Sequence, residues 1–216
     1  MRRTLIVLFI TAALWWLWRE RALRHAPGVI VSSPPIQTKV EPRALAEFKG
    51  YRMQAQATYL LQARVLRAKR YYGQGGDLVP YDVALAWGPM SDQRVLDRLK
   101  ISQTNRFFFY RWQDEPPISP DAMESHAANV HVISADKTVA KAVSSLRAGQ
   151  IATMKGYLVN VSKADGFRWN SSLTRDDSGN GACELFYVQA IRISDQPSVP
   201  EDAARARAAR SGRLAQ

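Results

Sequence analysis

Two stretches in the second half of the chain decide the fold: residues 150–162 (QIATMKGYLVNVS) and residues 184–194 (ELFYVQAIRIS). Both are largely apolar and rich in β-branched and aromatic residues, so both are predicted to be β-strands. Residues 169–184 between them (WNSSLTRDDSGNGACE) are mostly polar and contain two glycines, which is the composition of a hairpin loop. The sequence therefore predicts two strands joined by a polar loop.

Upstream of these strands, two helix starts flank a further strand. Residues 119–121 (SPD) place a capping hydroxyl before a proline at the first helical position, followed by an acid in the first turn. Asp136 can cap a second helix, whose apolar residues share one face: Val139, Val143 and Leu146. Between the two helices, residues 129–135 (NVHVISA) have the β-branched composition of a strand.

The first half of the chain is less clearly patterned. The segment from Tyr51 to Tyr72 fits both helical and strand spacing, and its tyrosines and polar alternation favour a mostly β structure. We expect a short helical turn at Asp82–Leu85, a helix that Ser91 caps, and a buried aromatic strand at residues 106–112 (RFFFYRW).

These elements predict an α+β fold with a mainly antiparallel sheet and a few short helices. Strands of this length could form a small closed or half-closed barrel. We expect one folded domain at residues 44–195. Residues 28–43 contain Pro34, Pro35 and Pro42 and are predicted to be an extended linker. Residues 196–216 are rich in alanine and arginine and are predicted to be a basic flexible tail.

Residues 1–27 have the pattern of an N-terminal transmembrane helix. An uncharged run lies between arginine clusters, beginning with Thr4 and Leu5 and ending at the tryptophans, where indole rings favour the membrane interface: Trp15, Trp16 and Trp18. A cleaved signal peptide is the alternative, but residues 21–28 (RALRHAPG) lack a clean cleavage site. The flanking charges nearly cancel, and the short tail before the run favours an exported, single-pass protein with a periplasmic domain.

Charge and cysteine content limit the function classes. The formal net charge is +11, of which residues 1–27 supply +4 (five arginines, one glutamate) and residues 196–216 supply +2 (four arginines, two acids). The central domain therefore has only a moderate basic excess. The single cysteine forms no intramolecular disulfide, so the domain is not a disulfide-stapled scaffold.

A basic, aromatic run suggests binding of a polyanion. No acid occurs between Glu47 and Asp77, whereas basic residues gather beside Tyr71 and Tyr72: Arg64, Arg67, Lys69 and Arg70. Basic side chains interleaved with aromatic rings can follow a phosphate backbone and stack on bases. The alternative is that these residues form the solvated face of a strand.

Residues 87–92 (WGPMSD) suggest a second binding feature, because Trp87 could act as a stacking plate. The alternative explanation is structural: Ser91 is a good helix cap, and Met90 can pack on Val95. Arg175, in the polar loop, is a further candidate binding residue, unless it pairs with Asp176 or Asp177.

Cys183 and His131 are the candidate catalytic residues, because a nucleophile needs a base within hydrogen-bond reach. Ser171 and Ser172 are alternative nucleophiles. However, the sequence around Cys183 lacks the context of a nucleophile elbow, and a free cysteine at the head of an apolar strand usually acts as a small hydrophobe. The spacing of His126 and His131 with one cysteine fits no trusted metal site, so we predict no metal and no cofactor.

Together, WGPMSD and the string SSLTR-x-D-x-G…ACE resemble a group of uncharacterised bacterial proteins with an N-terminal membrane anchor. The resemblance covers most of residues 50–195 and implies a bacterial, membrane-tethered protein, without implying an activity.

The expected function is a non-enzymatic interaction domain tethered to the bacterial inner membrane, as a component of an envelope or transfer assembly. Its expected partners are the lipid bilayer and other membrane or envelope proteins. A tethered nucleic-acid or polyanion binder is the alternative, and a cysteine or serine hydrolase is less favoured.

Overall fold

The computed structural model describes residues 11, 21–73, 75–174 and 183–196. The predicted anchor residues, with the exception of residue 11 and residues 21–27, lie outside the described part, and so do Arg175 and residues 197–216. Among the helices of the described part, none is long and apolar enough to cross a membrane.

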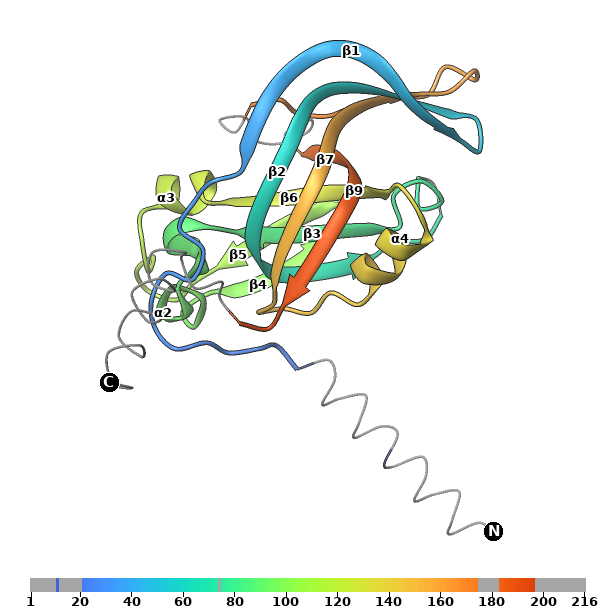
Figure 1. Cartoon of the computed structure of the whole chain (residues 1–216). Coiled ribbons are helices and arrows are strands. Elements are labelled where there is room, and N and C mark those ends of the chain that lie inside the picture. The colour runs from blue at the N-terminus through green and yellow to red at the C-terminus, as the bar shows by residue number, and fades with distance from the viewer. Residues whose placement is uncertain (1–10, 12–20, 74, 175–182, 197–216) are drawn as a thin grey trace, which may run out of the picture.

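The fold is a mixed α+β structure dominated by antiparallel strands, as predicted, with a few short helices (Figure 1). The strands are β1 (Ile36–Phe48), β2 (Tyr51–Arg70), β3 (Tyr81–Ala86), β4 (Lys100–Thr104), β5 (Phe107–Arg111), β6 (Ala127–Ser134), β7 (Ile151–Ser162), β8 (Arg168–Asn170) and β9 (Glu184–Ser194). The helical segments are η1 (Gly88–Ser91), α2 (Gln93–Leu96), α3 (Pro120–Ser125) and α4 (Lys137–Ser144).

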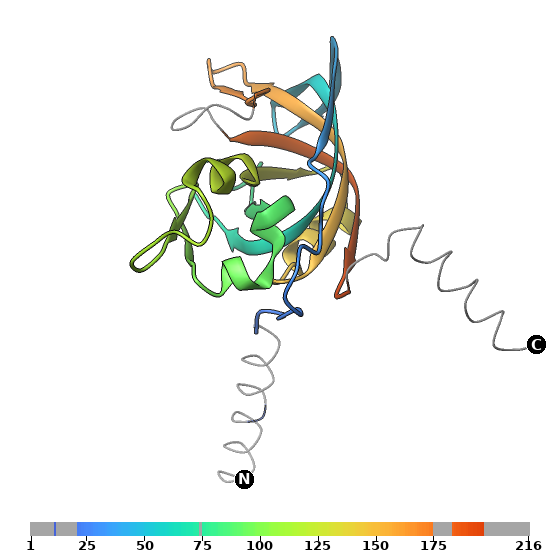
Figure 2. The same ribbon diagram turned by 90° about the vertical axis from the view of Figure 1, so that its left-hand side faces the viewer.

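Five strands form a closed ring of pairings, in the order β2-β3-β6-β9-β7 and back to β2. All neighbours are antiparallel except β6 and β9, which are parallel. A ring of paired strands is what closure into a small barrel requires. The chain passes from β6 to β7 through α4, while β1 and β8 extend the ring at its margins. Figure 2 shows the long strands β1 and β7 forming one wall of the molecule.

The inside of the ring is a continuous apolar core. All five strands contribute alternate side chains to it, and the aromatic ring of Tyr59 meets Phe186 edge-on at 5.1 Å between centroids. As predicted, Asp136 caps α4 by accepting from the Val139 N–H at 2.8 Å, and Val139 and Val143 are buried in the core. Ser119 likewise caps α3, as predicted.

The folded domain begins earlier than predicted, because the second half of the expected linker, residues 36–43, belongs to strand β1. This strand pairs antiparallel with β2, and its register shifts between Lys39 and Arg43, around Pro42. Proline has no N–H to donate, so within sheets it is tolerated at edge strands and irregularities. The proline that suggested a linker is therefore accommodated in an edge strand.

Three further local predictions for the first half were wrong. The expected helical turn at Asp82–Leu85 is strand β3, which pairs on both sides. Ser91 does not cap the next helix; the residue after it, Asp92, does so by accepting from the Arg94 N–H at 2.8 Å. The aromatic strand β5 is only half-buried, because it pairs with β4 alone in a separate hairpin.

Candidate functional site: a pocket on the outer face of the barrel

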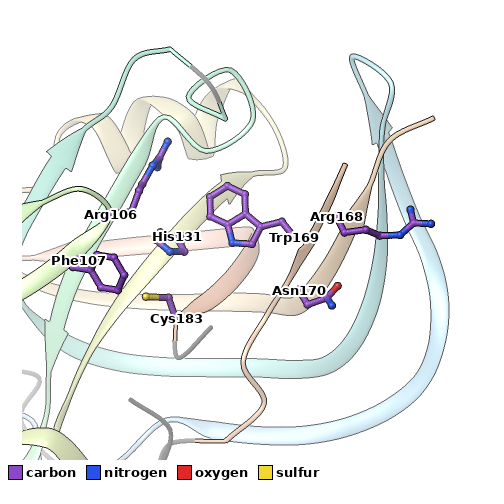
Figure 3. A pocket seen from close by; sticks show the side chains of 7 residues that line it. All are labelled: Arg106, Phe107, His131, Arg168, Trp169, Asn170 and Cys183. Atoms are coloured by element: carbon purple, nitrogen blue, oxygen red, sulfur yellow. The ribbon is translucent and has the colours of Figure 1, made fainter. Parts of the chain in front are cut away.

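A pocket of about 370 Å³ lies between β6, β8 and the tip of the β4–β5 hairpin (Figure 3). We call it the Arg106–Trp169 pocket. Its lining combines cationic, aromatic and polar side chains: Arg106, Phe107, His131, Arg168, Trp169, Asn170 and Cys183. Strand β6 is thus its floor, and two connections far apart in the sequence form its walls.

Two buried polar residues form the base of the pocket. Val83 and Val130 point into the barrel core, so Asp82 and His131, which alternate with them, point to the outer face. Asp82 and His131 are direct neighbours in the pairing of β3 with β6. His131 Nδ1 lies 2.9 Å from Asp82 Oδ1, although without the angle of a hydrogen bond, and Asp82 is fully buried. A buried carboxylate needs cationic partners, and His131 is one candidate partner.

Arg106 is the second partner of Asp82. It donates from Nη1 to Asp82 Oδ1 at 2.8 Å and to the Val79 carbonyl at 2.9 Å. Its guanidinium also lies over the Tyr71 ring, 4.3 Å from the centroid, and 5.8 Å from the Trp169 centroid. Burial raises the pKa of the Tyr71 hydroxyl. The Arg106 side chain is only 21% exposed, so its cation is held in one place.

The backbone of Arg106 is strained and well supported. Asn105 and Arg106 form the two-residue loop of the β4–β5 hairpin, with φ of 50° and 68°. Such hairpin turns need positive φ, which asparagine tolerates, whereas for arginine the left-handed conformation costs about 1 kcal/mol. The Tyr71 hydroxyl accepts from the Arg106 N–H at 3.2 Å, and Asn129 donates to the Arg106 carbonyl at 2.8 Å. Strain that the surroundings hold in place is a feature of functional sites.

The opposite wall is β8, which carries Trp169. The Trp169 ring lies 5.0 Å from the His131 ring, and β8 is joined to the start of β9 through Ser171 and Ser172. Ser171 Oγ accepts from the Leu185 N–H at 3.0 Å, and the Ser172 N–H donates to the Cys183 carbonyl at 3.1 Å. The two serines of the polar loop therefore position the wall of the pocket, and their hydroxyls are engaged with backbone.

The charged side chains that line the pocket are basic. Two arginines and a histidine line it, no acid is among its lining residues within the described part of the chain, and the nearby carboxylate of Asp82 lies buried beneath. Figure 3 shows Arg168 reaching outward at the rim, whereas Trp169 and His131 lie close together. Such an arrangement can bind an anionic group next to an apolar surface.

The structure brings the two candidate catalytic residues, Cys183 and His131, into the same pocket. His131 lies on β6, and Cys183, which is half-buried, directly precedes the parallel neighbouring strand β9. The serines proposed as alternative nucleophiles are not available in the same way, because Ser171 Oγ donates to the Ser172 carbonyl at 2.8 Å and Ser172 Oγ to the Thr174 carbonyl at 2.8 Å.

The predicted basic run does not form one surface. Arg67 and Arg70 are exposed, and the Arg70 guanidinium lies over the rings of Tyr72 and Tyr81. Lys69 donates to the Gln103 carbonyl at 2.8 Å, which fastens β2 to the hairpin that carries Arg106. Lys69 therefore helps to hold in place the hairpin that forms one wall of the pocket.

Arg64 and Trp87, two of the predicted binding residues, are only 2% exposed, and Trp87 is part of the apolar core. Arg64 donates to the carbonyl of Ser91 at 2.9 Å and to the Gln93 side chain. Burial lowers the pKa of the Arg64 guanidinium to about 10. A cation held in this way stabilises the fold, and both Arg64 and Trp87 offer little surface to a ligand.

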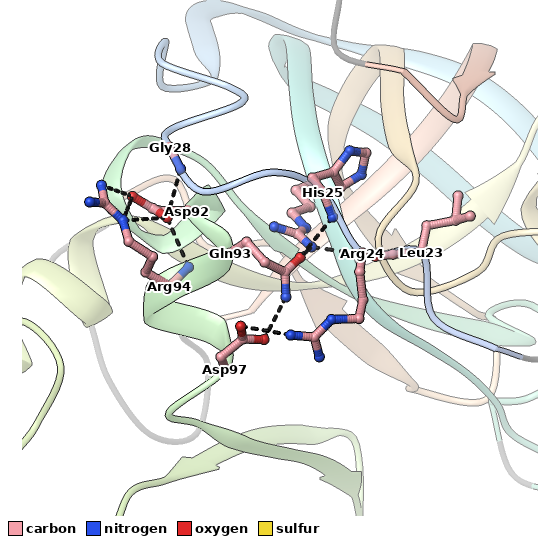
Figure 4. A network of polar contacts seen from close by, with 9 residues as sticks. Leu23, Arg24, His25, Gly28, Asp92, Gln93, Arg94 and Asp97 are labelled. Carbon is pink, nitrogen blue, oxygen red and sulfur yellow. Dashed lines mark hydrogen bonds and ion pairs between the residues drawn. The ribbon is translucent and has the colours of Figure 1, made fainter.

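The same network fastens the N-terminal segment to the domain. The Gln93 amide donates to Asp97, which also pairs with Arg24 at 2.7 Å, and the Gly28 N–H donates to Asp92 at 3.0 Å (Figure 4). The side-chain hydrogen bonds from Arg94 hold the pKa of Asp92 well below its usual value. Residues 23–31 therefore lie on the domain as a strap, which we call the N-terminal strap.

Sequence reasoning did not single out Arg106 or Trp169 of the pocket, nor the Asp82 that pairs with Arg106. Asp82 carried a signal, because it is an acid within an otherwise apolar run, and Asn105-Arg106 has the form of a tight turn. Within the described residues, no group of three or more metal-ligating side chains is present.

In comparisons with known proteins, no family, no curated protein and no solved structure matches this chain at a significant level. The ligand of the pocket is therefore inferred from the pocket's own residues.

Proposed function

We propose that this protein is a non-enzymatic recognition domain, tethered to the bacterial inner membrane, that binds a partner through the Arg106–Trp169 pocket. The observation that carries the proposal is the position of the pocket on the outer face of β3 and β6. The ring order β2-β3-β6-β9-β7, with one parallel pair (β6 and β9) and helix α4 between β6 and β7, is the connectivity of an OB-fold.

In OB-folds the ligand-binding face is formed by the second and third strands, with the loop between the first and second strands and the loop between the fourth and fifth. The second and third strands here are β3 and β6, and one pocket wall comes from the β7–β9 connection, which joins the fourth and fifth strands. The other wall comes from the β4–β5 hairpin, which is inserted between β3 and β6. Because one fold carries many functions, the lining residues themselves have to support binding. A fixed arginine beside aromatic walls does so.

The membrane tether is supported by the sequence of residues 1–27 and by the N-terminal strap. The strap begins within the last residues of the predicted anchor, after its uncharged run, and a domain fastened to it would stay close to the bilayer surface. On this proposal the domain lies in the periplasm and meets other membrane or envelope proteins, as part of an envelope or transfer assembly.

Site-specific photocrosslinking tests the proposal. A photoreactive amino acid is placed at Phe107 in the full chain, and the matched control carries it at Leu60, an exposed apolar residue of β2. In membranes of the producing bacterium, we expect discrete adducts from position 107 and none of the same size from position 60. Absence of adducts from position 107, or identical adducts from both positions, would contradict recognition through the pocket.

A cysteine hydrolase is the second candidate function, favoured by one observation: Cys183 and His131 line the same pocket, with Asp82 next to His131. This arrangement predicts that Cys183→Ala removes all function while position 107 still crosslinks. A recognition domain predicts that Cys183→Ala keeps both its adducts and its function.

A further inference from the structure

We infer that the Arg106–Trp169 pocket binds a carboxylate carried on a flat apolar body, and this inference rests on the recognition function proposed above. The carboxylate is either that of a small free acid or that of an acidic side chain of a partner protein. Both sources present the same chemistry to the pocket.

The carboxylate is assigned to Arg106. Only Nη1 of this guanidinium is used within the described residues, by Asp82 and Val79, so the edge formed by Nε and Nη2 makes no hydrogen bond there. A guanidinium edge matches the two oxygens of a carboxylate, and a fixed cation loses little entropy on binding. Asp82 lies behind Arg106, fully buried, and its Oδ2 has no hydrogen-bond partner in the described structure. The carboxylate that balances Arg106 is therefore out of reach of a ligand.

The apolar body is assigned to the aromatic walls. Phe107 and Trp169 line the pocket beside Arg106, and ring surfaces of this kind favour a flat apolar partner. A volume of about 370 Å³ is within the range of small-ligand pockets and holds one ring with its acidic group, rather than a folded segment. Arg168 at the rim adds positive charge on the side from which a ligand enters.

Cys183 provides the assay, because it lines the pocket and is the only cysteine of the chain. The purified full chain is treated with iodoacetamide, a neutral reagent, and the rate of alkylation is measured with increasing benzoate. Benzamide is the matched neutral probe, and sodium chloride at the same concentration controls for ionic strength. We expect benzoate to slow alkylation with saturation, and benzamide and chloride to leave it unchanged.

A peptide arm separates the two sources of the acid. Acetyl-Phe-Glu-Phe-amide is compared with acetyl-Phe-Gln-Phe-amide in the same assay. Protection by benzoate alone identifies a small free acid, and protection by the glutamate peptide, but not the glutamine peptide, identifies an acidic side chain of a partner. Protection by neither acid, or equal protection by the neutral probes, overturns the inference.

Variants assign the effect to Arg106. Arg106→Gln should raise the benzoate concentration for half-protection by at least about tenfold, as expected for the loss of a charge-assisted hydrogen bond. Arg106→Lys keeps the positive charge beside Asp82 but loses the forked pair of guanidinium donors, so it should also weaken protection by benzoate. It serves as the test variant if Arg106→Gln does not fold. Arg192→Gln, an exposed arginine near the far end of β9, is the matched control and should bind benzoate as the wild type does. Unchanged protection in a folded Arg106 variant overturns the assignment.

The photocrosslinking experiment distinguishes failure of this inference from failure of the proposed function. Adducts from position 107 without protection by either acid would leave a recognition site with another ligand chemistry. Absence of both adducts and protection would remove the proposed function as well.

Discussion

Ser91→Ala tests how the N-terminal strap is fastened to the barrel. The Ser91 hydroxyl is fully buried and accepts from the N–H groups of Ile30 and Val31, each at 3.2 Å, while it donates to the Gly88 carbonyl at 2.7 Å. Alanine leaves these groups without that partner, and one buried unsatisfied group costs about 1–3 kcal/mol. Because the accepted bonds are long and Ile30 is only half-buried, we expect a loss of about 2–3 kcal/mol in unfolding free energy.

Equilibrium unfolding in urea, followed by tryptophan fluorescence of the full chain in detergent, measures this loss. Ser119→Ala is the matched control, because the exposed Ser119 hydroxyl accepts one capping bond, from the Ala122 N–H at 3.3 Å. The control should lose at most about 1 kcal/mol. A Ser91→Ala variant that loses no more than the control would refute the assigned role of the strap contacts.

Three further substitutions test other parts of the structure. Hydrogen bonds to Arg94 lower the pKa of Asp92, so its carboxylate stabilises the fold above the unfolded pKa of about 4, and this contribution is lost as the pH falls below that value. Asp92→Asn should therefore cost about 1 kcal/mol at pH 7 and progressively less below about pH 4, whereas an equal cost at pH 3 and pH 7 would contradict it. Gly156→Ala places a Cβ 2.0 Å from the Tyr187 carbonyl oxygen and should cost about 2 kcal/mol or more in urea unfolding; a change within about 0.5 kcal/mol would argue against this close approach. Ser171→Ala removes the acceptor of the Leu185 N–H and should cost about 1–2 kcal/mol, and an unchanged midpoint would exclude a positioning role.

The parts of the fold that sequence predicted correctly carry local signals. Strands β6, β7 and β9 are runs of β-branched and aromatic residues, and the caps of α3 and α4 are short polar residues directly before a helical pattern. Such signals depend on neighbours in the chain. They were sufficient for the α+β class and for the mainly antiparallel sheet.

The predictions that failed concern residues whose role depends on distant partners. Pro42 suggested a linker, and only the pairing of β1 with β2 shows that it lies at an irregularity of an edge strand. Arg64 is hidden because the chain from residue 23 onward covers it, which charge alone does not indicate. The candidate pair Cys183 and His131 does share a pocket. Arg106 was not predicted to line it, because its position there depends on a tight turn and on a contact with Asp82, which lies 24 residues earlier in the chain.

Competition between benzoate and the partner at position 107 tests most directly whether an acidic group occupies the Arg106–Trp169 pocket. The full chain with the photoreactive residue at position 107 is illuminated in membranes with benzoate, with benzamide, or with neither. We predict that benzoate removes the adducts in a concentration-dependent way and that benzamide leaves them intact. If benzoate protects Cys183 from alkylation but the adducts persist at saturating benzoate, the result would contradict partner recognition through this pocket.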